Sequence, residues 1–234
     1  MSDSDLYLRV REQEGRLYTD EIVARLPEVP ADDPLKQEWD VRRASLKRFM
    51  RYVNGLPRPM RVLELGCGNG WLSHHLAALP DVKVWGVDRE SRELAQAARV
   101  FAQNNLAFLA ANIFQAPFRD HTFNIILIAS AIQYFADLPK LIRQLCRLLS
   151  PRGELHIMDS PVYDEADVQA AQERTQAYYA ALGFPEMASD YFHHTYAELK
   201  EFSPRWLHRP DSLQKRLTRS LGRADSPFPW LCIG

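Results

Sequence analysis

The sequence has few cysteines and no metal-binding cysteine pattern. Among its 234 residues only three cysteines occur, Cys67, Cys146 and Cys232, and no two of them form a CxxC arrangement. An odd number of widely spaced cysteines fits neither a disulfide framework nor a zinc ribbon. We therefore expect a reduced, cytoplasmic protein without a bound metal.

Neither sign of charge dominates, and no long apolar run occurs. The chain has 29 lysines and arginines against 30 aspartates and glutamates, which gives a net charge of -1. Such a balance provides no general attraction to nucleic acid or to an anionic membrane, so we expect neither as a partner. No uncharged apolar segment approaches the ~20 residues that cross a bilayer. The first ten residues carry acids where a secretion signal needs basic and then apolar residues.

Two regions differ in their patterning. Residues 1–60 are charged and helical in pattern, and we expect them to form an N-terminal helical cap or lid. A short helix is expected over 20–26. A longer one should begin with Asp33 as its cap and Pro34 at its first position, and end near residue 54. Residues 61–234 alternate strand-like and helix-like segments and form the main domain.

The alternation in this main domain predicts a doubly wound α/β fold. Strands are expected over 61–65, 82–87, 108–110, 123–129 and 154–158, with shorter ones over 205–208 and 228–233. Helical patterns separate them over 72–79, 94–101, 138–148 and 164–182. The result would be a Rossmann-like, seven-stranded, mostly parallel sheet with helices on both faces.

A glycine-rich turn joins the first expected strand to the helix after it. Segment 64–70 reads Glu-Leu-Gly-Cys-Gly-Asn-Gly. Glycines at such a turn let the backbone approach a ligand, and the following helix offers free N–H groups. A P-loop is excluded because no Lys-Ser/Thr pair follows. A dinucleotide fingerprint is disfavoured because its third glycine falls on Trp71, so an NAD-dependent oxidoreductase is a weaker alternative.

The same turn fits the pattern acid-x-G-x-G-x-G, which suits a ligand that joins an amino acid to a nucleoside without phosphate. Asp88 ends the second strand, where a carboxylate can accept hydrogen bonds from both hydroxyls of a ribose. Here the sequence resembles the class I S-adenosylmethionine-dependent methyltransferases, in particular their small-molecule branch with an N-terminal helical extension. Four segments carry the resemblance, in the order of that family's motifs: 62–70, 87–88, 112–123 and 126–135.

This resemblance implies S-adenosylmethionine as the cofactor and S-adenosylhomocysteine as the product. The positions that match the family's cofactor-binding residues are Glu64, Gly66, Cys67, Gly68, Asp88, Arg89, Asn112, Ile113 and Ala129. One of them departs from the pattern, because Asn112 stands where the family usually has an aspartate that meets the adenine amino group. Its amide oxygen can still accept that hydrogen bond.

The resemblance also places the methyl acceptor above the carboxyl ends of the fourth and fifth strands. Candidates for contact with it, from those strand ends and from the N-terminal lid, are Tyr7, Tyr18, Ser130, Gln133, Tyr134, Asp159 and Ser160. The catalytic candidates are Tyr163, His193 and His194. The two histidines lie in a weakly apolar insertion and should be partly accessible, and histidine accepts a proton near neutral pH.

The sequence thus predicts an enzyme that transfers a methyl group directly to a small-molecule acceptor. The end of the fourth strand reads Ala-Ser-Ala-Ile over 129–132, which lacks the N-P-P-Y type motif of enzymes that methylate DNA bases. Two alternatives remain open. The acceptor could be a protein side chain, or the chain could bind S-adenosylmethionine without catalysis and serve in interactions.

Overall fold

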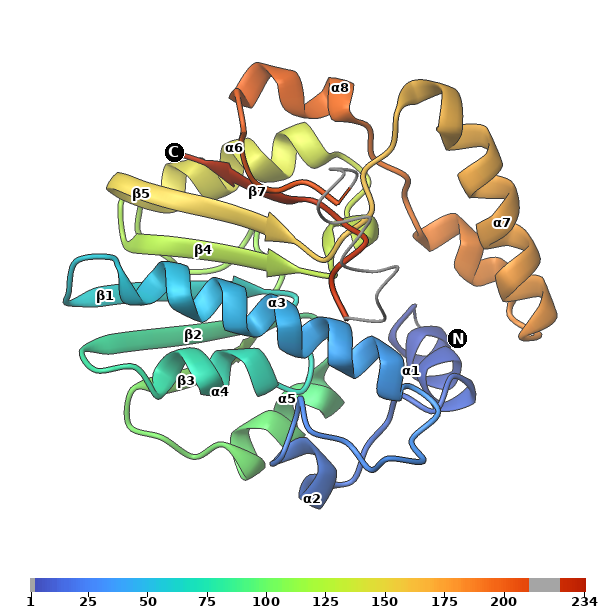
Figure 1. Ribbon diagram of the computed structural model, residues 1–234, viewed down its shortest axis with the longest axis horizontal. Helices are drawn as coiled ribbons and strands as arrows, with labels where there is room; N and C mark the ends of the chain where they lie inside the picture. Colours follow the sequence, from blue (N-terminus) through green and yellow to red (C-terminus); the bar gives the residue numbers. More distant parts are fainter. Residues whose placement is uncertain (1–2, 211–223) are drawn as a thin grey trace.

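One seven-stranded sheet forms the centre of the molecule in the computed structural model, which describes residues 3–210 and 224–234 (Figure 1). Its strand order is β3-β2-β1-β4-β5-β7-β6. The strands are β1 (Met60–Leu65), β2 (Val82–Asp88), β3 (Leu106–Ala110), β4 (Phe123–Ala129), β5 (Leu149–Met158), β6 (Arg205–His208) and β7 (Trp230–Ile233). The neighbours from β3 to β5 pair in parallel, and β7 is antiparallel to β5 and β6. This topology confirms the expected Rossmann-like sheet.

The central strands are buried on both faces, as their apolar sequences predict. β4 pairs with β1 on one side and with β5 on the other. Its residues Ile126 and Leu127 point to opposite faces of the sheet, and both are fully buried. Because β1, β2 and β4 are parallel, their carboxyl ends meet at one edge of the sheet, which we call the carboxyl edge.

Helices cover both faces of the sheet. On one face lie α3 (Lys36–Asn54) and α4 (Trp71–Ala77), and α5 (Ser91–Val100) lies beside β3. The other face is covered by α6 (Leu138–Leu148) and α8 (Tyr196–Leu199). Short 3-10 helices complete the chain: η1 (Ile132–Tyr134), η2 (Glu165–Asp167), η3 (Pro185–Asp190) and η4 (Lys200–Phe202).

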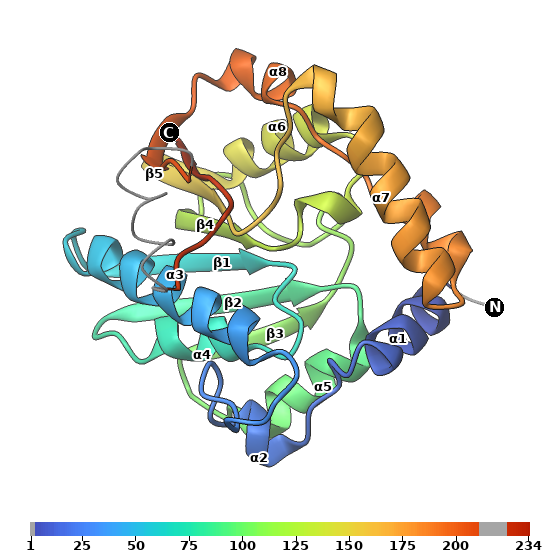
Figure 2. The same cartoon turned by 45° about the vertical axis from the view of Figure 1, so that its right-hand side comes forward.

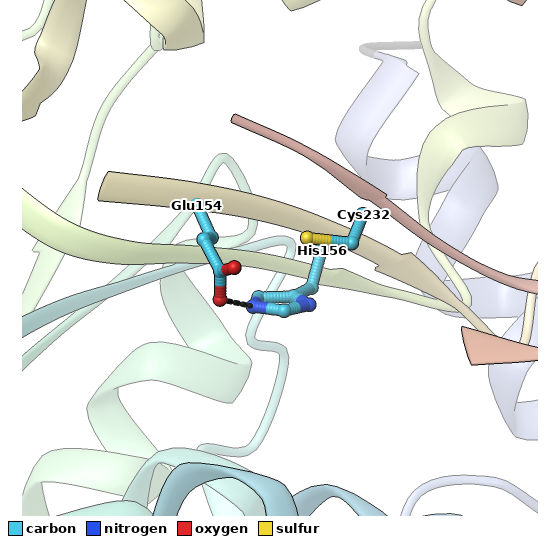
Figure 3. Close-up of side chains that lie close together, drawn as sticks. All are labelled: Glu154, His156 and Cys232. Carbon is cyan, nitrogen blue, oxygen red and sulfur yellow. Dashed lines mark ion pairs between the residues drawn. The ribbon is translucent and has the colours of Figure 1, made fainter. Parts of the chain in front are cut away.

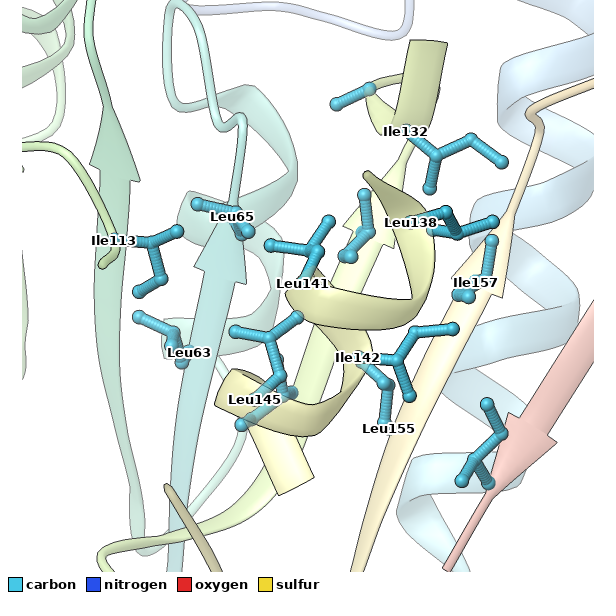
Figure 4. Packing of buried hydrophobic residues seen from close by; sticks show 14 of the residues in the cluster. Leu63, Leu65, Ile113, Ile132, Leu138, Leu141, Ile142, Leu145, Leu155 and Ile157 are labelled. Carbon is cyan, nitrogen blue, oxygen red and sulfur yellow. The ribbon is translucent and has the colours of Figure 1, made fainter. Parts of the chain in front are cut away.

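The helix α6 shows how sequence spacing produces this packing. Leu138, Leu141, Ile142 and Leu145 recur at helical intervals, so they form one apolar stripe. Figure 4 shows this stripe facing β1 and β5, and its residues share one buried cluster with Leu63 and Leu155. The helix starts where the Asp137 side chain accepts a hydrogen bond from the Lys140 backbone N–H at 2.8 Å.

The helix α3 departs from the sequence prediction in two ways. It begins at Lys36, two residues after the expected proline, because the Asp33 carboxylate accepts a hydrogen bond from the Leu35 N–H and closes a turn ahead of the helix. It is also part of the sheet's core, since Phe49 and Val53 are fully buried against strand residues. Within residues 1–60, α3 therefore covers one face of the sheet, and the segments before it lie beside the carboxyl edge. Their action as a lid stays a prediction.

Two segments far apart in sequence meet beyond the carboxyl edge. They are α1 (Asp3–Gln13), which the sequence analysis did not predict, and α7 (Val168–Ala181); α2 (Asp20–Val23) follows α1. In Figure 2 the arrowheads of β1 and β2 point toward the side where α1 and α7 lie, and in Figure 1 those of β4 and β5 do so. Leu6 and Val10 of α1 pack against Tyr179 of α7 and Met187 of η3. None of the helices in the described ranges combines the length and apolar character that crossing a membrane requires.

Candidate active site

The glycine-rich turn lies between β1 and α4, where the backbone leaves no room for side chains. Gly66 has a φ of +76°, and a Cβ there would lie 2.5 Å from the Cβ of Ala131. Gly70 has a φ of +75°, and its Cβ would lie 2.5 Å from the ring of Phe108. Both positions therefore require glycine. Because Gly70 is the residue that packs closely against Phe108 of β3, the next residue need not be small. That residue is Trp71, the first residue of α4.

Asp88 connects the turn to the end of β2. Its Oδ2 accepts a hydrogen bond from the Gly68 N–H at 2.8 Å. Its Oδ1 accepts from the backbone N–H groups of Arg89 and Glu90, at 2.7 and 3.0 Å. A carboxylate offers about four acceptor sites, so Asp88 retains capacity for a further donor such as a hydroxyl. These bonds hold the carboxylate in one orientation beside the turn.

Glu64 lies beneath the turn and is only 3% exposed. The Ser73 hydroxyl donates a hydrogen bond to its Oε2 at 2.5 Å. Burial raises the pKa of Glu64 to about 8, so this carboxyl group is largely protonated at neutral pH. A cationic group placed against it would favour the ionised form and lower that pKa.

A cavity lies above the turn, and Glu64 and Asp88 line it. The other positions predicted to bind the cofactor line it too: Gly66, Cys67, Gly68, Arg89, Asn112, Ile113 and Ala129. Burial raises the pKa of the Cys67 thiol, which suits a packing role better than a nucleophilic one. The Asn112 Oδ1 accepts a hydrogen bond from the Phe114 N–H at 3.1 Å. In this structure the Asn112 amide oxygen therefore stabilises the turn at residues 112–114.

A cavity of about 590 Å³ opens above the turn at the carboxyl edge. Small-molecule sites typically measure ~300–1,000 Å³, so this one can hold a cofactor together with part of an acceptor. We call the part formed by the turn, Asp88 and segment 112–113 the donor end. The acceptor end is formed by Tyr7, Trp39, Ser130, Tyr134 and Asp159, which line the other part of the cavity.

Two strand ends build the floor of the acceptor end. Ser130 follows β4 and Asp159 follows β5, and both have a left-handed backbone, with φ of 56° and 51°. Non-glycine residues adopt this conformation rarely, and it is enriched at functional sites. The Ser130 hydroxyl donates to the Asp159 carbonyl at 2.9 Å, and the Ser45 hydroxyl donates to the Asp159 carboxylate at 2.7 Å. Burial raises the pKa of Asp159 above its ordinary value.

Three predicted tyrosines also line the cavity. The Tyr7 hydroxyl of α1 donates to Glu93 Oε2 at 3.4 Å, and its ring meets that of Tyr134 edge to face at 5.8 Å. Tyr18 donates to Asp33 at 3.3 Å and accepts a hydrogen bond from the Trp39 indole at 2.8 Å. The two N-terminal tyrosines thus bring residues of α1 and the α1–α2 connection to the acceptor end.

The predicted catalytic residues lie outside this cavity. His194 is only 2% exposed, so the expectation that it is accessible is wrong. Its Nε2 lies 3.1 Å from the Ile132 carbonyl and its Nδ1 3.4 Å from Glu198. The Nε2 of His193 lies 2.9 Å from the Thr175 hydroxyl, and its ring lies tilted against that of Tyr163, with centroids 5.7 Å apart. Both histidines line a separate pocket under α7, so the geometry gives them no access to the acceptor end.

Two of the predicted acceptor residues are structural as well. Gln133 is buried, and its side-chain amide donates to the Ser130 carbonyl at 2.8 Å, so it supports the floor from behind. Ser160 is buried and donates to the Met158 carbonyl at 3.3 Å. Neither side chain lines the cavity.

The sequence analysis missed several residues that line the cavity: Arg11, Arg16, Trp39, Arg42, Met187 and Phe192. Arg42 and Trp39 both belong to α3. Trp39 is only 3% exposed, and its side chain lines the cavity. No local sequence signal separates these positions from ordinary surface or core residues. Only the packing of α1 and α3 beside the carboxyl edge brings them together.

A cluster elsewhere in the fold has the residue types of a metal site. Glu154 and His156 of β5 lie beside Cys232 of β7, with potential ligand atoms within 4.8 Å of one another (Figure 3). The Trp230 indole donates to His156 Nδ1 at 3.2 Å, which leaves the proton on Nε2, facing Glu154. The Arg205 guanidinium lies 2.6 Å from Glu154 and 3.3 Å from the Cys232 sulfur. This arginine supplies the positive charge, so we assign the cluster a structural role.

Comparison with known proteins adds an independent line of evidence to this geometry. A family model described as a methyltransferase domain matches residues 57–223. The chain belongs to this methyltransferase family. Together with the Rossmann-like sheet, the match establishes a class I S-adenosylmethionine-dependent methyltransferase domain, a family that uses S-adenosylmethionine as its cofactor.

Individual relatives of this methyltransferase are distant. The 27-O-demethylrifamycin SV methyltransferase of Amycolatopsis mediterranei is 27% identical over 164 residues, which cover 63% of this chain and 60% of that protein. The demethylmenaquinone methyltransferase of Thermus thermophilus is 35% identical over 106 residues, 44% of this chain and 48% of that protein. The chain spans about half the length of the curated relatives it matches. A SAM-dependent methyltransferase from Aquifex aeolicus shares the fold, with a TM-score of 0.54 and 16% identity over 93% of this chain and 97% of that one.

Proposed function

We propose that the chain is an enzyme that transfers a methyl group from S-adenosylmethionine to a small-molecule acceptor. The observation that carries the proposal is one cavity that joins the glycine-rich turn and Asp88 to an aromatic chamber beside α1. The names of two relatives, which concern rifamycin and demethylmenaquinone, support an acceptor of this class. Enclosure by N-terminal residues favours a small molecule over the side chain of a folded protein.

The donor end would hold the cofactor through its fixed polar groups. Asp88 would accept hydrogen bonds from the ribose, and the turn would place backbone N–H groups near the amino-acid portion. Glu64, held in a protonated form by burial, would ionise when a cationic portion of the ligand approaches. When bound, S-adenosylmethionine supplies a methyl group that its sulfonium has already activated.

The acceptor end would align the nucleophile and exclude water. Tyr7, Trp39 and Tyr134 provide flat aromatic walls, and Ser130 provides a hydroxyl at the floor. Orientation of two reactants in a dry site can supply a large part of a rate enhancement for a displacement of this kind. These side chains therefore have a positioning role in the proposal.

We assign the proton acceptor to Asp159 in place of the histidines. Asp159 lines the cavity, whereas His193 and His194 do not. Burial raises the pKa of Asp159, which brings the carboxylate closer to the range in which a general base is effective. A hydroxyl acceptor would transfer its proton to the Asp159 carboxylate while its oxygen bonds to the methyl carbon; the bond from that carbon to the cofactor's sulfur would break, and S-adenosylhomocysteine would leave.

The test uses radiolabelled S-adenosylmethionine and a protein-free extract of small metabolites. We expect label in a small-molecule product, lost with Asp88→Ala and retained with Asp120→Ala, an exposed aspartate paired with Arg147 away from the cavity. Label found only in precipitated protein, when cell protein is added, would identify a protein acceptor instead. Binding of S-adenosylhomocysteine without any transfer would indicate the catalytically silent alternative.

A further inference from the structure

Three arginines from the N-terminal part of the chain line the cavity. Arg11 lies in α1, Arg16 in the connection after it, and Arg42 in α3. The chain as a whole has almost equal numbers of acidic and basic residues. These three guanidinium groups line a cavity that acidic residues such as Glu93 and Asp159 also line.

Arg42 is held in place by contacts that leave its charge incompletely balanced. Its Nη2 lies 2.6 Å from Glu38 Oε1, and its guanidinium lies 4.7 Å from the centre of the Trp39 ring. Glu38 is shared, because Arg16 Nη1 donates to the same oxygen at 2.7 Å. Burial lowers the pKa of Arg42 even though Glu38 opposes that effect. A negative charge brought to this side chain would remove the imbalance.

Arg11 has unused hydrogen-bond donors. Its Nη2 is 3.7 Å from Glu93 Oε1, which is longer than a hydrogen bond. Its Nε is buried and has no hydrogen-bond partner among the described residues. Buried donors without partners cost roughly 1–3 kcal/mol each, so they mark places where a ligand can bind. Arg11 and Arg42 both line this cavity.

The acids in this region face the arginines from several elements. Glu14 and Glu38 pair with Arg16, and Glu93 lies beside Arg11. Burial raises the pKa values of Glu93 and Asp159, and both side chains line the cavity. Glu14 and Glu38 do not line the cavity, so they contact the arginines from behind it. The guanidinium groups of the three arginines, which these acids hold in place, therefore line the cavity.

We propose that the methyl acceptor carries an oxyanion, a carboxylate or phosphate group, that Arg11 and Arg42 bind inside the cavity. This inference rests on the proposed function and adds the chemical class of the substrate. A guanidinium presents a planar fork of N–H groups that matches carboxylate and phosphate oxygens. The aromatic side chains of Tyr7, Trp39 and Tyr134 would contact the apolar body of the same molecule.

A carboxylate at these arginines could also be that of the cofactor's own amino-acid portion. The two sources differ in a measurable way. S-adenosylhomocysteine carries this carboxylate, whereas 5′-methylthioadenosine lacks the amino-acid portion. The affinity of each variant for both compounds therefore shows whether an arginine binds the donor or the acceptor.

The experiment compares Arg11→Met and Arg42→Met with Arg43→Met. Arg43 is a matched control, since it lies on α3, pairs with Glu28 and does not line the cavity. Labelled product from the metabolite extract is separated by anion exchange at neutral pH. We expect the product to be retained on the resin. We also expect a roughly 10- to 100-fold lower kcat/KM for it in the two cavity variants, with unchanged affinity for S-adenosylhomocysteine and an unchanged control.

Each alternative outcome has a separate meaning. A labelled product that passes through the resin uncharged overturns the acidic acceptor and leaves the proposed methyl transfer intact. Loss of affinity for S-adenosylhomocysteine, with 5′-methylthioadenosine binding unchanged, would assign the arginines to the donor and also overturn the inference. Absence of any labelled product contradicts the proposed function itself. Thermal unfolding shows whether each variant has kept its fold. A variant that has not is replaced by the lysine substitution at the same position, Arg11→Lys or Arg42→Lys.

Discussion

The donor end and the acceptor end of one cavity are built in different ways. The donor end comes from one continuous stretch, in which the glycine-rich turn, Asp88 and Asn112 each follow a strand of the parallel sheet. The acceptor end combines α1, α3, η3 and the ends of β4 and β5, which are separated by more than a hundred residues of sequence. The first arrangement is determined by local backbone geometry, and the second depends on how distant helices pack.

This difference explains why a family can keep its cofactor while its acceptors vary. A turn that admits only glycine at Gly66 and Gly70 tolerates little change. Arginine, tyrosine and tryptophan side chains on N-terminal helices can be exchanged without changing the sheet. Function at the acceptor end must therefore be argued from the side chains present, because the fold alone does not specify it.

The largest expected effect tests the acceptor end. Asp159→Asn should slow transfer to a protonated acceptor by about 10²–10⁴-fold, the usual contribution of a general base. The rate of the wild type should fall as pH decreases, because a base must be deprotonated, and burial places this acidic limb above the ordinary range of an aspartate. Ser45→Ala removes a hydrogen bond to the carboxylate and should move the limb to higher pH. An unchanged pH–rate profile in Asp159→Asn would rule out this role.

The second prediction concerns the rigidity of the donor end. Gly66→Ala places a Cβ 2.5 Å from Ala131 in a left-handed backbone, and should lower the free energy of unfolding by about 3 kcal/mol. Gly183→Ala is the matched control, since Gly183 has a φ of +84° and a methyl group added there would meet no atom within 4 Å. Gly183→Ala should lower the free energy of unfolding only by the strain of a left-handed backbone, about 1–2 kcal/mol. Urea unfolding of both variants measures the difference, and equal losses would show that packing against Ala131 contributes nothing.

The third prediction tests the ribose contact. Asp88→Ala should weaken binding of S-adenosylhomocysteine by about 1.5–3 kcal/mol, the range for a hydrogen bond to a charged group. Part of this loss would come from the turn, because Asp88 also accepts from the Gly68 N–H. Calorimetry with wild type, Asp88→Ala and Asp88→Asn separates the effect of charge from that of shape. Unchanged affinity in Asp88→Ala would remove this residue from the donor end.

The contrast between the two ends also shows what the sequence could reveal. The positions of the strands along the chain, the turn and the positions of Asp88 and Glu64 followed from apolar runs and glycine spacing, which report local structure. Tyr134 and Asp159 followed from the resemblance, which implies an acceptor above the carboxyl ends of the fourth and fifth strands. The arginines could not be found, because Arg42 on a charged helix face looks the same whether it meets solvent or a cavity. His194 was misplaced for the same reason, since its burial depends on packing with η1 and α8.

The fourth prediction uses the protonation of Glu64 at the donor end. Its pKa of about 8 in the fold lies above that of an exposed glutamate, so the folded state binds the proton more tightly than the unfolded state. The contribution of Glu64 to the free energy of unfolding is therefore most favourable at low pH. It falls by up to about 1.4 kcal/mol per pH unit as the pH rises toward 8. Glu64→Gln should remove that part of the slope. Identical slopes for both proteins between pH 6 and 8 would mean that Glu64 is ionised in the fold.

The smallest expected effect concerns Asn112, where this chain departs from the family's usual aspartate. Its Oδ1 accepts a hydrogen bond from the Phe114 N–H, so its first role is to hold the loop beside the cavity. Asn112→Asp keeps that acceptor and adds charge, so it should retain or improve affinity for S-adenosylhomocysteine by up to about 1 kcal/mol. Asn112→Leu removes the acceptor and should weaken binding by a similar amount. Calorimetry on the three proteins checks the order Asp, Asn, Leu. Equal affinities would show that backbone and apolar contacts alone hold the adenine, and that the donor end depends on Asp88 and the turn.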